Sequence, residues 1–553
     1  MPSAKIAVGP LLPGAPRHVV HRNAFAFFVS MGILLNISLM PMKAYLSEHL
    51  PWMRETQAPA SSNFTEFNAS TLLQYQAKYN ISTLPPNCIY FNDAAAGVEL
   101  VRVDLDMATH AAIARDDCVS AFLLGKPGVI YYTTSIRLLL CDLAAANASS
   151  FHLLAWQNRG TCVYNTYFGL YIGHQCVWIT ADDVAHAHRL TISMAIAAYA
   201  ATAWLWCKLA FRVGISLVTL YLLYAKYYRH CLDLESLLRS HGHKRVCNKH
   251  WRYEVIWGDP TALILLNPAI AGIFALDCWL SVDIVAVAIM RASQAHEITA
   301  MLLGCLYLSR TVWFAYAALC GVNTYLKRHK KEHLFAEVDP TLVAIAATIY
   351  GPLVTWMVGN VEFILALFHA LFDLVVPTAL KRDRFDGSIP STLYSLMLAS
   401  LPVVFGFTHA LLRRPRTTPR DLHLYSSFHF NNIKTRLVLS TLHILQRHLP
   451  ANVPAIGGTM HRLFELAPRY KRSPTISFRG SDCYVHCFCD GVLEERLRLS
   501  LVDDLDRLVL EPDVAIHDAP DASTYSVNVL VLPSALCAHP RLQRPRQPSV
   551  WCL

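Results

Sequence analysis

The segment NFTEFNASTLLQYQAKYNIS, residues 63–82, contains three Asn-x-Ser/Thr sequons, and a fourth follows in the same polar stretch. The acceptor asparagines are Asn63, Asn68, Asn80 and Asn147. Half of the eight asparagines between residues 41 and 189 are acceptors, whereas only Asn36, inside an apolar run, is an acceptor among the ten elsewhere. N-glycans are attached to exposed loops outside the cytosol. The clustering therefore predicts that residues 43–189 form a glycosylated ectodomain.

The composition is typical of an integral membrane protein. Hydrophobic residues make up 54% of the 553 residues and charged residues only 16%, whereas about a quarter of the residues in soluble proteins are charged. The net charge of +9 comes from basic residues beside apolar runs rather than from one aromatic-interleaved basic patch. These residues therefore indicate orientation in the membrane, and we expect no nucleic acid partner.

The first apolar run predicts an uncleaved signal-anchor. Residues 1–23 contain Lys5, Arg17 and Arg22 but no acidic residue, which favours a cytosolic N-terminus. The run from 24 to 42 is about as long as a spanning helix requires, and it ends without a small-x-small cleavage site. A cleaved signal peptide is the competing interpretation, and both leave the sequons outside.

Five further spans follow from the apolar runs and the basic residues after them. We predict span 2 at 190–211, a basic cytosolic loop at 212–260, spans 3 to 6 at 261–290, 298–322, 341–376 and 392–412, and a cytosolic tail at 413–553. Span 5 is tilted, broken or, in the alternative, a hairpin that gives seven crossings and an external tail. The expected fold class is a mainly α membrane protein. Its polytopic bundle of about six spans carries a small disulfide-supported α+β ectodomain between spans 1 and 2 and a small cytosolic α+β tail domain.

Local patterns predict mixed structure in the two polar regions. The β-branched and aromatic residues at 128–134 are typical of a strand, and 136–146 fits a short helix. In the tail, leucines at helical spacing predict helices within 437–449 and 493–508. The basic, proline-containing segment 541–553 is typical of a disordered end.

The predicted ectodomain has five cysteines, which cannot all pair within one chain. Cys162 and Cys176 flank a strand-like segment, so a bridge between them would close a loop of hairpin size. Cys88 and Cys118, each beside polar turn residues, form the next expected pair. Cys141 follows three leucines, which favours a buried free thiol.

Three charged residues within apolar runs are candidates for chemistry. Asp277 and Asp283 fall in predicted span 3 and Arg310 in predicted span 4. An ionised side chain in the bilayer costs roughly 3 kcal/mol unless it is paired or hydrated. An Asp–Arg pair across the two helices would neutralise both charges, either as a substrate or proton site or as an internal staple.

Metal-binding patterns are weak. Cys483, His486, Cys487 and Cys489 gather soft ligands, but a structural zinc site usually has two separated ligand pairs, and the alternation fits a strand equally well. The paired acids Asp104–Asp106 in the ectodomain could hold a divalent cation, although such spacing is common on solvated surfaces. Phosphate-loop, kinase, dinucleotide and hydrolase motifs are absent from the sequence. We therefore expect no metal and no cofactor.

These observations predict a polytopic membrane glycoprotein that binds a ligand or partner, as a receptor or scaffold, without catalytic residues. The ectodomain would bind an extracellular ligand or protein, and the basic cytosolic loops would contact partners or anionic lipid. A secondary transporter or channel using Asp277, Asp283 and Arg310 is the alternative, and a membrane-bound transferase with an acidic lumenal site is the third. The expected location is the plasma membrane or a secretory-pathway membrane.

Overall fold

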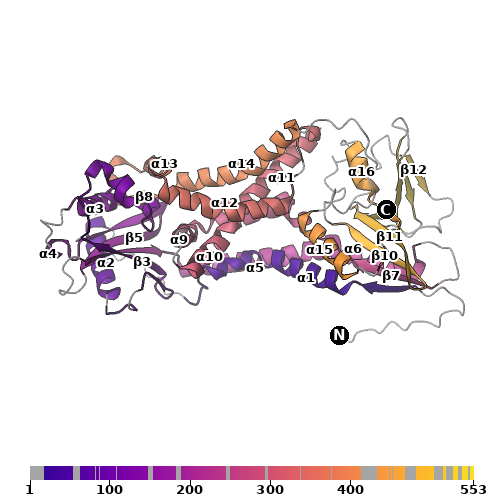
Figure 1. Ribbon diagram of the computed structural model, residues 1–553, viewed down its shortest axis with the longest axis horizontal. Coiled ribbons are helices and arrows are strands. Elements are labelled where there is room, and N and C mark those ends of the chain that lie inside the picture. Colours follow the sequence, from indigo (N-terminus) through magenta and orange to yellow (C-terminus); the bar gives the residue numbers. More distant parts are fainter. Residues whose placement is uncertain are drawn as a thin grey trace.

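The computed structural model has a long helical bundle with a β-sheet domain at each end (Figure 1). It describes residues 18–553 apart from gaps at 54–62, 81, 86–87, 108, 147–152, 182–188, 244–249, 293–296, 330, 337, 375, 413–431, 447–448, 451–452, 467–480, 503–514, 519–526, 533–538 and 546–548. We call the sheet domain inserted between the first two bundle helices the loop domain, and the one at the opposite end the tail domain.

The bundle is built from apolar helices, and the longer ones run along the long axis (Figure 1). They are α1 (Ala24–Ser38), α5 (Thr202–Leu223), α7 (Ala262–Leu265), α8 (Pro268–Trp279), α9 (Val282–Ala292), α10 (Ile298–Leu308), α11 (Val312–Arg328), α12 (Pro340–Asn360), α13 (Glu362–Asp373) and α14 (Ser388–Leu412). In the described residues, four continuous helical stretches are long and apolar enough to cross a membrane: Thr202–His241, Ile298–Arg328, Pro340–Asn360 and Ser388–Leu412. These are the features of a membrane-embedded protein.

Two interruptions shape the bundle. Helices α8 and α9 together are long enough to count as a fifth span, but they meet at an angle of 72°. The bend lies within residues 261–290, the range predicted as span 3. A short 3-10 helix, η8 (Ser309–Thr311), joins α10 to α11 and carries the side chain of Arg310 into the bundle.

The loop domain contains a six-stranded sheet in the order β2-β3-β6-β5-β4-β8. Its elements are β2 (Tyr90–Asp93), β3 (Val98–Asp106), β4 (Gly160–Tyr167), β5 (Leu170–Ala181), β6 (Arg189–Ala198), β8 (Arg384–Asp386), α2 (Phe64–Lys78), α3 (Thr134–Ala144) and α4 (Leu153–Trp156). Strand β8 pairs in parallel with β4, and the other pairs are antiparallel. Helix α2 packs against strands β4 and β5 through one apolar cluster, while a second cluster joins the sheet to α3 and to bundle helices.

The boundary predicted between the ectodomain and span 2 was wrong. Residues 190–198 belong to β6, a central strand of the sheet, and the helix begins only at Thr202. A strand covered on both faces is a continuous apolar run without alternation, so it resembles the start of a spanning helix. The strand predicted at 128–134 was also wrong, because Val129–Tyr131 form a 3-10 helix, η4.

The tail domain collects strands from distant parts of the chain. Its main sheet has the order β1-β7-β10-β11-β15, with β9 on β11, and a smaller sheet has the order β12-β14-β13. The elements are β1 (Val19–Arg22), β7 (Trp251–Ile256), β9 (Ala455–Gly457), β10 (Cys483–Cys489), β11 (Val492–Leu501), β12 (Ala515–Asp518), β13 (Val529–Val531), β14 (Arg541–Arg544), β15 (Trp551–Cys552), α6 (Arg229–His241), α15 (Ile433–Leu445) and α16 (Thr459–Leu466). Strand β1 thus lies in one sheet with strands from after the last bundle helix.

Two predictions for the tail were wrong and one was confirmed. The leucines from 493 to 501 lie on strand β11, not on a helix, and residues 541–553 contribute β14 and β15 rather than a disordered end. Trp551 is 1% exposed and donates from its indole Nε1 to the carbonyl of His230, 2.9 Å away. The helix predicted within 437–449 is present as α15, which begins four residues earlier and ends at Leu445.

Candidate functional site: a buried ionic cluster in the helical bundle

Five charged side chains meet inside the bundle. They come from the segment after α1, from α5, from α8 and from η8. We call Glu48, Lys208, Arg212, Asp277 and Arg310 the ionic cluster. Each is at most 5% exposed, and Arg212 is fully buried. The predicted Asp277–Arg310 pair is present as a direct ion pair between α8 and η8.

Glu48 is the centre of the cluster. Its carboxylate accepts two hydrogen bonds from the Arg212 guanidinium, at 2.7 and 2.8 Å, one from the Tyr307 hydroxyl at 2.5 Å, and longer ones from Lys208 and Arg310, both at 3.3 Å. Paired parallel bonds between arginine and carboxylate are among the strongest hydrogen bonds in proteins. Glu48 therefore joins α5, α10 and η8 to the segment that leads into the loop domain.

Asp277 is the second carboxylate of the cluster. One oxygen accepts from Arg212 Nε at 2.9 Å and the other accepts from Arg310 Nη2. Arg212 also donates to the Ser281 hydroxyl at 2.8 Å, just before α9 begins. Arg212 thus contacts both α8 and the bend that precedes α9.

The cluster holds three cations and two carboxylates, so one positive charge is in excess. Two aromatic rings lie against the guanidinium groups: Tyr45 at 4.9 Å from Arg212 and Tyr307 at 4.9 Å from Arg310, measured from the guanidinium carbon to the ring centroid. Ring faces are electron-rich and attract cations, more strongly where water is excluded. These contacts offset part of the excess charge.

In this geometry the buried charges pair with one another and hold the helices together, and they do not line a hydrated pathway. We call this arrangement a packed staple. All four carboxylate oxygens accept hydrogen bonds from protein groups. Two pockets, one lined by Val29 and Val438 and the other by Val101 and Met194, include no residue of the cluster. Chemically, the cluster can hold four segments in register, and removal of either carboxylate would leave buried cations without their partners.

A second buried ion pair connects the bundle to the loop domain. Arg291 on α9 contacts Glu99 on β3, and both side chains are 4% exposed. The Tyr90 hydroxyl of β2 also donates to Glu99. Helix α9 begins directly after Ser281, which Arg212 contacts, and carries Arg291 near its other end, so it connects the ionic cluster to this second ion pair.

The sequence predicted two of the five residues of the ionic cluster. Asp277 and Arg310 were recognised because single charges stand out in apolar runs, and the structure brings them together. Asp283, the third candidate, lies at the start of α9, beyond the bend, and is 9% exposed. Lys208 and Arg212 were not among the candidates, although their four-residue spacing puts them on one face of a helix and is the signal that could have found them. Glu48 was missed because it follows the apolar run among polar residues.

The disulfides partly differ from the expected pairs. Cys162 and Cys176 are bonded, as expected, across the paired strands β4 and β5. The second bond joins Cys118 to Cys141, not to Cys88, so the pairing of Cys88 with Cys118 and the free thiol at Cys141 were wrong. Cys141 is on α3, and the apolar leucines before it pack that helix onto the sheet beside the segment of Cys118. Cys88 has a free thiol.

The sequons differ in their surroundings. Asn63 is exposed and caps α2, where its Oδ1 accepts from the amide of Thr65 at 3.1 Å. Asn80 forms a turn in which its Oδ1 accepts from the amides of Ser82 and Thr83. Asn68 is half-buried, and its Oδ1 accepts from the amide of Cys162 at 2.8 Å. Asn147 lies outside the described residues.

The candidate metal ligands of the tail remain spread along a strand. Cys483, His486, Cys487 and Cys489 are all buried on β10. In the described ranges, no group of three or more His, Cys, Asp or Glu side chains is placed to hold a metal ion, and this includes Asp104 and Asp106. Asp104 instead accepts from the Thr191 hydroxyl across the sheet, at 2.9 Å.

Comparison of the chain with family models, with curated proteins and with solved structures gives no match.

Proposed function

We propose that the protein is a receptor or scaffold of the plasma membrane or a secretory-pathway membrane, which binds a ligand or partner outside and relays its state to the tail domain inside. In this proposal six segments cross the membrane: α1 with η1 (Pro41–Leu46), α5, α8–α9, α10–α11, α12 and α14. The loop domain is the glycosylated ectodomain, α1 is an uncleaved signal-anchor, and the tail domain is cytosolic.

The alternation of the chain between the two sheet domains supports this topology. The segment between α12 and α14 returns to the loop domain, where β8 pairs with β4 and the His369 ring on α13 contacts the Val129 carbonyl at 3.1 Å. Each of the six segments therefore has one end near each sheet domain (Figure 1). A hairpin at Asn360, with an external tail, has no comparable support.

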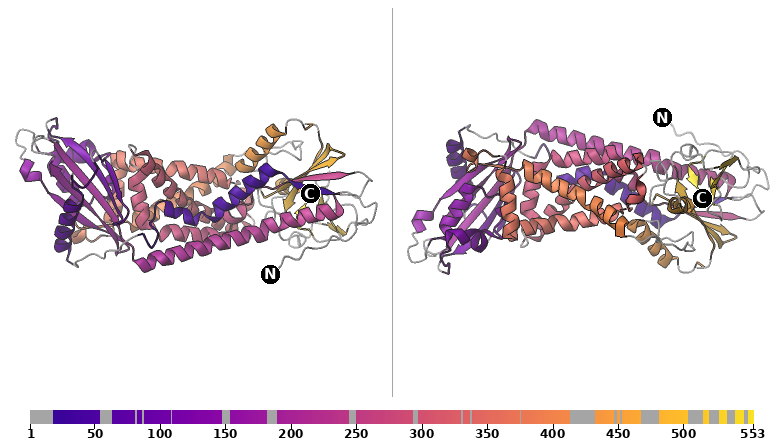
Figure 2. Two further views of the ribbon diagram at one scale, coloured as in Figure 1. Left: turned by 90° about the horizontal axis from the view of Figure 1, so that it is seen from below. Right: turned by 90° about the horizontal axis from the view of Figure 1, so that it is seen from above.

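One helical path joins the two sheet domains, and this supports a relay. The stretch Thr202–His241 is 40 residues long, about 60 Å at 1.5 Å per residue, and follows β6 of the ectodomain after three residues. It runs the length of the bundle to the tail domain (Figure 2). There Arg22 of β1 forms a bidentate ion pair with Glu235, at 2.7 and 2.9 Å.

The single observation that carries the proposal is the ionic cluster. It holds this long helix, through Arg212, to both the bend of α8–α9 and the segment that enters the ectodomain. A change in the ectodomain would therefore act on α5 through Glu48 and on α9 through Arg291. Side chains from the protein itself occupy every carboxylate of the cluster, which favours a mechanical role over transport.

A transporter or channel remains the alternative, because a broken helix beside buried charges is also a feature of transport proteins. Ser281 distinguishes the two, since it lies at the bend and hydrogen-bonds to Arg212. We propose the variant Ser281→Cys in a background where the free ectodomain thiol Cys88 and the bundle cysteines Cys207, Cys278, Cys305 and Cys320 are alanine. The reaction with a charged, water-soluble thiol reagent is then measured in sealed vesicles.

A packed staple predicts that Ser281→Cys reacts at least about a hundredfold more slowly than Thr109→Cys, an exposed position of the ectodomain. Reaction at rates within tenfold of that control would mean that water reaches the cluster, which favours transport and overturns the proposal. The transport alternative is tested further by Asp283→Asn, which should leave surface expression and partner binding unchanged in a receptor or scaffold.

A further inference from the structure

Helix α13 is apolar on all its sides. The residues between Glu362 and Asp373, FILALFHALF, include no acidic residue, lysine or arginine. A helix that is apolar all round is normally buried, either inside a large protein or in a membrane. Each face of α13 is therefore expected to have a cover.

The loop domain covers one face of α13. The buried side chains on this face are Leu365, His369 and Phe372. The His369 ring contacts the Val129 carbonyl of η4 at 3.1 Å, and the Phe372 ring packs against that of Phe385 on β8, with the centroids 4.1 Å apart. Through these contacts α13 is fixed to the sheet domain.

The opposite face of α13 is exposed. Phe363 is 77% exposed, Leu367 is 48% exposed, and Leu374, directly after the helix, is 69% exposed. Spacings of four and seven residues put these side chains on one side of a helix. The part of the chain that the structure describes thus leaves an apolar strip of α13 largely uncovered.

Helix α13 lies where the bundle ends. It follows α12 directly after Val361 and runs across the long axis, between the bundle and the loop-domain sheet (Figure 2). Nearby helix ends expose tryptophans: Trp356 in the last two turns of α12 is 58% exposed, and Trp204 and Trp206 in the first two turns of α5 are 39% and 51% exposed. Tryptophan is enriched where spanning helices meet the membrane surface. These side chains put α13 at the depth of a membrane–water interface.

The helices on either side of α13 have lipid-facing surfaces. Both α12 and α14 contact α13, and each is long and apolar enough to cross a membrane. On these helices Leu353 is 50% exposed and Leu396 is 59% exposed. Lipid that surrounds α12 and α14 therefore reaches the exposed face of α13 at their loop-domain ends.

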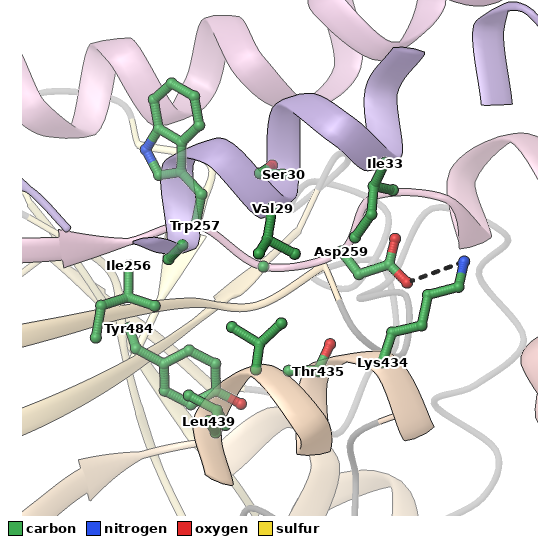
Figure 3. Close-up of a pocket in the computed structure, with 13 residues that line it drawn as sticks. Val29, Ser30, Ile33, Ile256, Trp257, Asp259, Lys434, Thr435, Leu439 and Tyr484 are labelled. Carbon is green, nitrogen blue, oxygen red and sulfur yellow. Dashed lines mark ion pairs between the residues drawn. The ribbon is translucent and has the colours of Figure 1, made fainter. Parts of the chain in front are cut away.

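Helix α15, at the other end of the bundle, differs from α13. It packs on α1, where Val29 of α1 and Leu439 of α15 line the same small space, and its Lys434 pairs with Asp259 at 3.7 Å (Figure 3). That junction is covered by protein side chains and contains charges. The exposed face of α13 has neither, which favours lipid over water as its surroundings.

We propose that α13 is an in-plane membrane helix, whose exposed face lies among the lipid acyl chains just below the headgroups, in the leaflet on the loop-domain side. Its length, about 18 Å, is too short to cross a hydrocarbon core of about 30 Å. Interfacial helices usually have one face in lipid and a polar face in water. On α13 the loop domain takes the place of the water.

The lipid surface would thereby fix the orientation of the loop domain, because the buried face of α13 holds β8 and η4. The proposal requires that the bundle crosses the membrane. It does not depend on a receptor role, so it applies equally to a transporter, and it does not depend on which side of the membrane the loop domain occupies.

Photocrosslinking from single positions of the full chain in phosphatidylcholine vesicles tests which partner covers the strip. Benzoylphenylalanine replaces Phe363, to which it is close in shape, and in separate variants it replaces Leu353, the control in lipid, or Thr109, an exposed control in the loop domain. We expect lipid adducts from Phe363 with a yield like that from Leu353, and none from Thr109.

Two results would overturn the proposal. A covalent dimer of the chain as the main product from Phe363 would assign this face to a second copy. A lack of lipid adducts from Phe363, as at Thr109, would show that the face lies in water.

The depth of α13 is measured in the unmodified protein, so the result does not depend on the folding of a variant. Two phosphatidylcholine probes carry a diazirine, one near the ester and one at the methyl end of the acyl chain. The shallow probe should label Phe363, Leu367 and Leu374 alike, and the deep probe should label Ile349 of α12 but none of these three. If α13 instead continued α12 into the bilayer, Phe363 and Leu374 would differ in depth by about 16 Å. Deep labelling of one end of α13 only would therefore contradict the proposal.

Discussion

His174, on β5, illustrates how one residue can make the loop domain sensitive to pH. Its ring nitrogens each lie 2.7 Å from a tyrosine hydroxyl, Tyr75 at Nε2 and Tyr171 at Nδ1. Burial lowers the pKa of His174 from 6.5 to about 4. Because the folded pKa is below the unfolded one, the unfolded chain binds more protons between these values, and stability falls as the pH falls from about 6.5 to 4.

We therefore expect the melting temperature of the protein to decrease between pH 7 and pH 4.5. The linked loss from this group is at most about 3 kcal/mol. In His174→Gln that part of the pH dependence should disappear, although the variant is less stable at pH 7. The exposed His333→Gln serves as the control and should retain the slope. An unchanged slope in His174→Gln would show that other groups cause the effect.

Asn68 permits a second prediction at the scale of one residue. Its Oδ1 already accepts from the amide of Cys162, beside a disulfide, and the side chain is half-buried. Glycan attachment at its nitrogen requires that the side chain be accessible before the sheet forms. We expect glycopeptide mapping to give lower occupancy at Asn68 than at the exposed Asn63, and equal occupancy would contradict this.

At the scale of the element, the link between α13 and α14 stabilises the β4–β5 hairpin through hydrogen bonds to Asp386. Asp386 is 3% exposed, and its Oδ2 accepts from the Thr166 hydroxyl and the amide of Gly169, each at 2.9 Å. Asp386→Ala leaves these donors without a partner, which costs about 1–3 kcal/mol. We expect a matching loss in unfolding free energy and faster proteolysis at the hairpin, whereas Asp116→Ala, at an exposed position, should change neither.

Elements differ in how well the sequence predicts them, and the reasons are physical. The last span was predicted at 392–412 and observed as α14 from Ser388, because apolar length is a strong signal for a helix. The leucines 493, 497 and 501 were assigned to a helix because a spacing of four is close to its period, but four is also even, so Leu497 and Leu501 share one face of strand β11, while a bulge before Glu495 turns Leu493 to the other face. Spacing alone could not separate these two structures.

Contacts between distant segments were the hardest to predict. The ionic cluster depends on Glu48 meeting Arg212, which is 164 residues away in sequence. An unpaired Asp277 carboxylate would cost free energy in the bilayer, so the sequence indicates that it has a cationic partner. Which residues are its partners depends on how the helices pack. The sequence could therefore indicate that a buried pair exists, but not that five charges share it.

At the scale of the whole molecule, the ionic cluster determines whether the bundle stays in register. Glu48→Gln would leave three buried cations with one carboxylate, and breaking a buried ion pair from one side costs about 3–5 kcal/mol. We expect a loss of this size in unfolding by SDS, followed by tryptophan fluorescence. Glu362→Gln, an exposed position at the start of α13, is the matched control. A loss below about 1 kcal/mol in Glu48→Gln would mean that the cluster does not hold the bundle together.

The mixed origin of the main tail sheet has a consequence for biosynthesis. Strand β1 leaves the ribosome before the first bundle helix, β7 between the second and third, and β10 and β11 only after the last. Strand β1 can pair with β7 once two bundle helices have been made, but the other edge of β7 must wait for β10 while the remaining helices are inserted, and such edges readily pair with other chains. Insertion errors in any helix would put a strand on the wrong side of the membrane. Completion of this one sheet is thus a checkpoint on the topology of the whole chain.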